Sequence, residues 1–269
     1  QPISKISSDA VAAIDVAMEA LSQWGVRIPE TSRLHQARAL LSEARSLPNV
    51  PLDLHGAAQG LHALEVAYDF RDIANALPNR RVASWRKELE QCLKGELDVE
   101  ATNRQPLQLQ SQYVVIAALH RAGVELEYPT QPAKKRGKSP EVIAINGAAK
   151  YSLEVKRPER AKNIVHRVSD AAEQITDFGL EGAIIVDLTD AVRSVPAASF
   201  DEAARNEVLR LYGQIWVDGD GPRQGFEPIF VAGGFARRAW YVDNGPPPLI
   251  KIQTHSSIGR FAMTPNTLR

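Results

Sequence analysis

The sequence has one cysteine, Cys92, among 269 residues. A single cysteine excludes an intramolecular disulfide and a cysteine-rich zinc site, and it favours a reducing compartment such as the cytoplasm. No apolar run approaches the roughly 20 residues that a membrane span needs, so no membrane partner is expected. Neither a His-Glu-x-x-His motif nor a Gly-x-Ser-x-Gly motif occurs. The composition, 44% hydrophobic and 24% charged, is that of an ordinary globular protein.

The chain also has no net charge, but its charges are unevenly distributed. Residues 131–167 carry ten lysines and arginines against three glutamates. A local charge of +7 suits a partner that bears phosphates, because neutralising phosphates releases counterions. A solvated basic face would have the same composition, so charge alone leaves both interpretations open.

Apolar spacing predicts that residues 1–103 form an N-terminal all-α domain. Val11, Ile14, Met18 and Leu21 repeat at helical intervals, and similar stripes follow over 57–68 and 82–92. Proline and glycine interrupt these stripes at 25–29, 48–51 and 78–79, which favours four helices.

Residues 104–269 form the second predicted domain, in which helices and strands alternate. We expect helices over 107–123, 162–178 and 199–214, and strands over 124–128, 141–145, 151–156 and 183–186. Three late strands are expected over 229–232, 239–242 and 249–252. This order predicts an α/β fold with a mixed central sheet flanked by helices.

Two acidic strands lie on either side of Asn146-Gly147, a strong hairpin signal. A four-residue loop over 146–149 would place Glu141 directly opposite Glu154, whereas a two-residue Asn-Gly turn would place them diagonally. Both registers leave the two carboxylates on one face, which Lys156 shares, because strand side chains alternate with period two.

Two carboxylates this close repel each other unless a cation lies between them, and a hard divalent cation takes such oxygen ligands. Lys156 would then orient the attacking water or stabilise a pentacoordinate phosphorane. An exposed strand face with a simple Glu154–Lys156 ion pair is the competing interpretation.

The order of elements around Pro140-Glu141 and Glu154-Val155-Lys156 resembles the PD-(D/E)XK nuclease superfamily over residues 107–190. The resemblance implies the restriction-endonuclease-like fold and phosphodiester hydrolysis with Mg²⁺ or Mn²⁺. It places Glu141 at the motif's Asp, Glu154 at its second acid and Lys156 at its lysine, with the Val155 carbonyl as a further metal ligand. The chain departs from the pattern in having Glu141 rather than Asp, and Gln112 where many members carry a helical Glu.

The resemblance also points to Gln174 as an accessory residue on the helix after the lysine strand, where a solvated glutamine is an equal alternative. Basic residues on both sides of the acidic strands are expected to bind phosphates, the alternative being a flexible solubilising loop. They are Lys134, Lys135, Arg136, Lys138, Arg157 and Arg160.

The predicted function is therefore a metal-dependent nuclease, with DNA as the expected partner rather than RNA. Many members of the superfamily act as dimers, so the resemblance implies a homodimer. The alternative is a weak or inactive module of the same fold that binds nucleic acid or a protein partner without cutting.

Overall fold

The computed structural model describes residues 3–46, 54–77, 82–97, 103–128, 141–193, 199–217, 221–242 and 249–260. The chain divides into two compact units. The first contains residues 1–121 and 237–253, and the second contains residues 122–236 and 254–269. Among the helices of the described ranges, none combines the length and the apolarity that crossing a bilayer demands.

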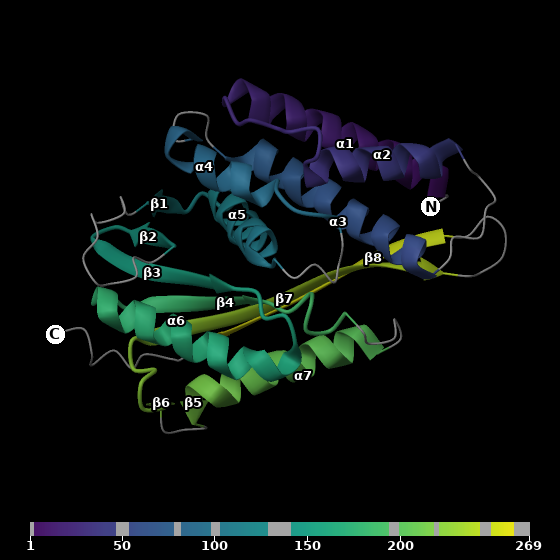
Figure 1. The fold of residues 1–269 in the computed structure, drawn as a ribbon. Coiled ribbons are helices and arrows are strands. Elements are labelled where there is room, and N and C mark those ends of the chain that lie inside the picture. Colours follow the sequence, from purple (N-terminus) through teal and green to yellow (C-terminus); the bar gives the residue numbers. More distant parts are fainter. Residues whose placement is uncertain are drawn as a thin grey trace. The chain divides into compact units, whose positions relative to one another are not determined.

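Within the described ranges, the first unit contains five helices (Figure 1). They are α1 (Ile3–Gln23), α2 (Arg33–Ser46), α3 (Leu54–Ala76), α4 (Val82–Cys92) and α5 (Gln105–Arg121). Helix α1 buries a stripe of small and aliphatic side chains, including Ala10, Ile14 and Leu21, against α2 and α3. The prediction of an N-terminal helical region is confirmed, and Cys92 lies in its core, where burial raises the pKa of the thiol.

Helix α5 groups with this helical unit, so the division falls after Arg121 and not at the predicted boundary of 103/104. Side chains of α5 explain the difference. The Tyr113 hydroxyl donates to Glu88 Oε2 on α4 at 2.7 Å, and Gln110 Nε2 donates to Asp69 Oδ2 on α3 at 2.6 Å. Side-chain hydrogen bonds therefore join α5 to α3 and α4.

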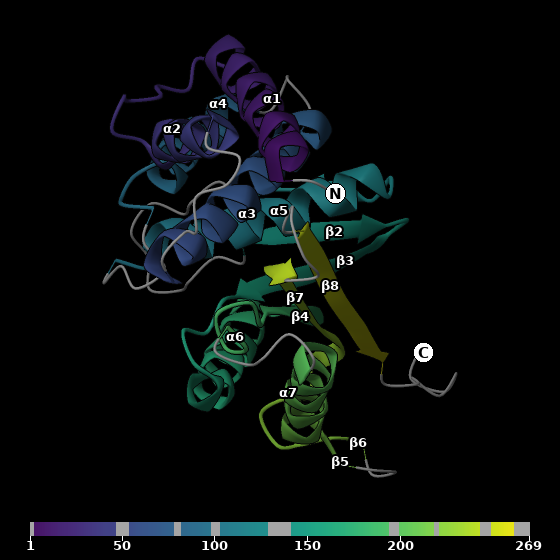
Figure 2. The same cartoon turned by 90° about the vertical axis from the view of Figure 1, so that its right-hand side faces the viewer.

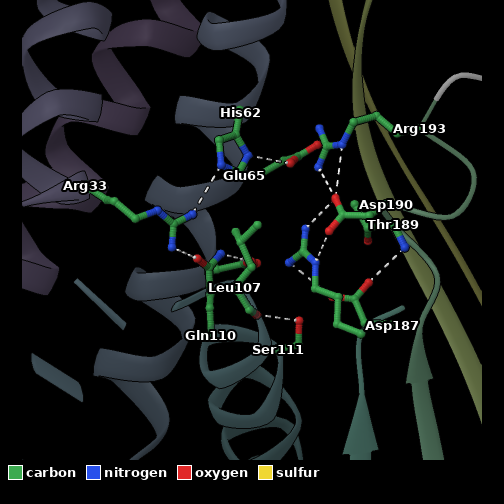
Figure 3. A network of polar contacts seen from close by, with 12 residues as sticks. Arg33, His62, Glu65, Leu107, Gln110, Ser111, Asp187, Thr189, Asp190 and Arg193 are labelled. Atoms are coloured by element: carbon green, nitrogen blue, oxygen red, sulfur yellow. Dashed lines mark hydrogen bonds and ion pairs between the residues drawn. The ribbon is translucent and has the colours of Figure 1, made fainter. Parts of the chain in front are cut away.

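A buried arginine joins three helices of the first unit (Figure 3). Arg33 on α2, 1% exposed, donates to Gln110 Oε1 on α5 at 2.8 Å and contacts His62 Nε2 on α3 at 3.2 Å. Because a guanidinium only donates, His62 Nε2 must accept here, and its Nδ1–H then donates to Glu65 Oε2 at 3.1 Å. This network fixes α2, α3 and α5 in one arrangement.

A mixed sheet has strand order β1-β2-β3-β4-β7-β8, with β7 at Ile229–Val242 and β8 at Leu249–Arg260. Strands β1 to β4 lie wholly in the second unit, which also contains residues 229–236 of β7 and 254–260 of β8. The first four strands are β1 (Glu125–Glu127), β2 (Val142–Asn146), β3 (Ala149–Lys156) and β4 (Gly182–Asp187). Strands β1, β2 and β3 pair antiparallel, whereas β3, β4 and β7 pair parallel. This confirms the predicted α/β class with a mixed sheet.

Two helices, α6 (Ile164–Phe178) and α7 (Phe200–Ile215), lie on the same face of this sheet (Figures 1 and 2). A short 3₁₀ helix, η2 (Ala161–Asn163), leads into α6, which buries Val168, Ala171 and Ile175. Strands β5 (Trp216–Val217) and β6 (Gly221–Pro222) form a separate two-stranded sheet. Helix α6 is thus the crossover between the parallel strands β3 and β4.

The end of the chain differs from the expectation of three late strands. The described residues form two late strands, β7 (Ile229–Val242) and β8 (Leu249–Arg260). The pair Gly233-Gly234 interrupts the apolar pattern of β7 without interrupting the strand. A Cβ at Gly234 would lie 2.8 Å from Val208 Cγ2 of α7, so glycine is present because the helix packs closely on the strand.

Candidate active site

The β2–β3 hairpin brings the two predicted acidic residues together. Val142 pairs with Leu153 and Ile145 with Lys150, which is the register that places Glu141 opposite Glu154. The two residues between the last paired positions are Gly147 and Ala148, and Gly147 adopts φ +62. A positive φ at the first loop residue is a feature of the primed hairpin turns, which glycine adopts readily.

Each carboxylate is held by the backbone of the other strand. The Val155 N–H donates to Glu141 Oε2 at 2.8 Å, and the Glu141 N–H donates to Glu154 Oε1 at 3.3 Å. The Glu154 side chain is fully buried and that of Glu141 is 17% exposed. The hairpin therefore fixes both acids at one end of the sheet, with only Glu141 reaching solvent.

Lys156 completes the cluster on the same face. Its Nζ donates to Glu154 Oε2 at 2.6 Å and lies 3.6 Å from Glu141 Oε1. Helix α6 contributes Gln174, whose Oε1 accepts a hydrogen bond from Lys156 Nζ at 2.9 Å. The structure thus brings together four predicted residues, Glu141, Glu154, Lys156 and Gln174, and their catalytic roles remain predictions.

Two buried carboxylates share one ammonium group, so the cluster is short of positive charge. Burial raises the pKa of Glu141 to about 8, and the neighbouring Glu154 charge adds to the rise. Lys156 and the hydrogen bond from Val155 oppose this shift without cancelling it. At neutral pH the pair therefore retains a proton, and this marks a position that favours additional positive charge.

The donor set is compatible with a small divalent cation. No group of three or more His, Cys, Asp or Glu side chains gathers within the described ranges. Two carboxylates form a smaller set, and Mg²⁺ is commonly bound by one or two carboxylates, with water and substrate phosphates as its other ligands. Glu141 and Glu154 fit that pattern, and the Val155 carbonyl stays a predicted ligand.

The predicted phosphate-binding residues have different outcomes. Lys134, Lys135, Arg136 and Lys138 lie outside the described residues. Arg160 is exposed just before η2, so its predicted role stands as a prediction. Gln112 is buried on α5 in the first compact unit, and its accessory role also stays a prediction.

The predicted role of Arg157 as a phosphate-binding residue is corrected by the structure. Its side chain is only 5% exposed, and its Nε and Nη2 donate to the two carboxylate oxygens of Asp190 at 2.7 and 3.0 Å. The guanidinium is therefore an internal ion-pair partner and not a solvent-facing phosphate contact. Sequence analysis missed Asp187 and Asp190, although an acid at the end of a buried strand parallel to β3 was the available signal.

No protein-family model, curated protein or solved structure matches this chain.

Proposed function

We propose that this protein is a divalent-metal-dependent phosphodiesterase that hydrolyses nucleic acid, with DNA as its main substrate. The observation that carries the proposal is the cluster of Glu141, Glu154 and Lys156 on one face of the β2–β3 hairpin. Two acids and one lysine on adjacent strands also form the constellation of the PD-(D/E)XK superfamily, which the sequence resembles.

We further propose that the sheet is of the restriction-endonuclease-like type. Three features support this: the antiparallel order β1-β2-β3, the parallel step from β3 to β4, and α6 as the crossover helix. In this arrangement the acids of two neighbouring strands and a residue of the crossover helix converge, as Gln174 does here.

Glu141, Glu154 and the Val155 carbonyl would hold Mg²⁺ or Mn²⁺. The bound ion supplies charge neutralisation at a phosphate oxygen and lowers the pKa of a coordinated water. Glu141 is the more exposed of the two acids, so its carboxylate faces the position from which substrate approaches. The buried Glu154 holds Lys156 in place on the same face.

Lys156 is the protein side chain that would supply positive charge to the reaction. Its ammonium is fixed between Glu154 and Gln174, so it requires little reorganisation when negative charge develops on the phosphorane. Gln174 accepts from Lys156 without adding a negative charge to the two carboxylates already beside the ammonium. Loss of Lys156 should therefore reduce the rate more than it reduces binding.

The local charge of +7 over residues 131–167 suits a polyanionic substrate. Arg160 is the described member of the predicted phosphate-binding set that is exposed to solvent. Contacts of this kind bind the backbone and carry no sequence information. Binding is therefore expected to weaken steeply as salt concentration rises.

The test is cleavage of plasmid and single-stranded DNA in Mg²⁺ or Mn²⁺ by wild type, Lys156→Ala and Lys150→Ala. Lys150 is the matched control, because it lies on the same strand but is 48% exposed and pairs with Glu127. The proposal expects cleavage by wild type and Lys150→Ala and its loss in Lys156→Ala. Binding without cleavage by wild type would favour the alternative of an inactive module, and equal cleavage by all three would contradict the role of Lys156.

A further inference from the structure

A second charged cluster follows the proposed active-site lysine directly in the chain. Arg157 is the residue after Lys156, and its fork donates to both oxygens of Asp190. Its Nη1 also lies 3.4 Å from Asp187 Oδ2. Arg193 donates to Asp190 Oδ1 through Nη2 at 2.8 Å and through Nε at 3.1 Å. Figure 3 shows Asp187, Asp190 and Arg193 in this cluster.

The parallel register explains why these residues meet. Lys156 pairs with Val186, so the next residues along the two strands, Arg157 and Asp187, are neighbours. Successive side chains of a strand point to opposite faces. The Arg157 side chain therefore lies on the face of the sheet opposite to Glu154 and Lys156. Its contacts hold the end of β3 from that opposite face.

The segment that receives Arg157 is itself held by hydrogen bonds. Asp187 Oδ1 accepts from the Thr189 N–H at 3.0 Å, and the Leu188 N–H donates to the Phe235 carbonyl of β7 at 2.7 Å. Although burial alone would raise the pKa of Asp190, the Arg157 and Arg193 guanidinium groups hold it well below its usual range. Asp190 is therefore ionised, and its pair with Arg157 joins the end of β3 to the turn that follows β4.

We propose that Arg157 and Asp190 are positioning residues that hold the end of β3 so that the Lys156 ammonium stays between Glu154 and Gln174. The expected effect on catalysis rests on the proposed function, whereas the expected effect on the position of Lys156 does not. The Lys156 ammonium has two acceptors within 3 Å. Misplacement of a catalytic group by about 1 Å can cost about a hundredfold in rate. A change at Asp190 should therefore act on catalysis without touching substrate.

The experiment compares Asp190→Asn and Arg157→Gln with Asp15→Asn in the full chain. Asp15 accepts from Arg38 at 2.7 Å on the surface of α1, so it provides the same chemical change at an exposed ion pair. The first readout is the ¹H–¹⁵N signal of the Lys156 ammonium in lysine-labelled protein, assigned with Lys156→Met. The second is the kcat and KM of DNA cleavage.

We expect both cluster variants to shift or lose the Lys156 signal and to lower kcat about tenfold, with KM within about twofold of wild type. Asp15→Asn should leave both readouts unchanged. An unchanged Lys156 signal in folded Asp190→Asn would overturn the inference, even if the variant unfolds more easily, because a purely structural role lowers stability alone. If Arg157→Gln does not fold, Asp190→Asn decides the question.

Absence of cleavage in wild type would overturn the proposed function, and the Lys156 signal would still decide whether Arg157 and Asp190 position that lysine.

Discussion

Replacing Glu141 with glutamine should change how the protein's stability depends on pH. Burial beside Glu154 raises the pKa of Glu141 from its usual 4.5 to about 8. The folded protein therefore retains this proton at pH values where the unfolded chain has released it. A group that binds its proton more tightly in the folded state makes stability fall as pH rises.

The size of the effect follows from the interval between the two pKa values. Each pH unit between 4.5 and about 8 lowers the free energy of unfolding by about 1.4 kcal/mol. Over the interval the loss is about 3–5 kcal/mol, with the lower figure allowing for rearrangement around Lys156. Below pH 4.5 and above pH 8 this contribution should be constant. Glu141→Gln removes the titrating group and with it this part of the slope.

The assay is urea unfolding of wild type and Glu141→Gln from pH 5 to pH 9 in a metal chelator. We expect the variant to become more stable than wild type as pH rises, with the difference complete near pH 8 to 9. Glu127→Gln makes the same substitution on an exposed carboxylate of β1 and serves as the control. Parallel pH profiles for wild type and Glu141→Gln would refute the account of the buried acid pair.

Three further changes test other parts of the structure. Gln174→Ala removes one acceptor of the Lys156 ammonium, and kcat for DNA cleavage should fall about tenfold while the fold is retained; an unchanged kcat would contradict an accessory role. Arg33→Met leaves buried imidazole and amide acceptors without their donor, so urea unfolding should show a loss of about 3 kcal/mol. Gly182→Ala places a Cβ 2.7 Å from both Ile175 Cγ2 and the Ser152 carbonyl oxygen and should cost about 1–3 kcal/mol, whereas a neutral result would mean that both α6 and β3 can move away from this position.

The hairpin shows what the sequence could determine about the candidate site. Period-two alternation placed Glu141, Glu154 and Lys156 on one face in either register, and this did not depend on the turn. The choice between the two registers of the hairpin did depend on the turn. The signal Asn146-Gly147 favours an Asn-Gly loop, but the structure closes the hairpin one residue later, with Gly147 at the position that needs positive φ. Local turn preference alone could not show this.

Arg157 shows where local reasoning fails. Its position beside other cations led to the prediction that it contacts phosphate. In the structure its partner is Asp190, which lies 33 residues away in the sequence. The parallel register of β3 and β4 brings Arg157 and Asp190 together, and this register is not visible in the sequence around Arg157. In β7, similarly, the close contact of Gly234 with Val208 of α7 is not visible in the sequence of the strand.

The most direct test of the central claim is a crystal soaked with Mn²⁺ and measured for anomalous scattering. We expect one strong peak between Glu141 and Glu154, at about 2.0–2.5 Å from carboxylate oxygens of both residues. We also expect Lys156 to remain on the same face as the ion. A fully soaked crystal with no peak at these carboxylates, or with Mn²⁺ bound only elsewhere, would contradict the claim that this acid pair binds a catalytic metal.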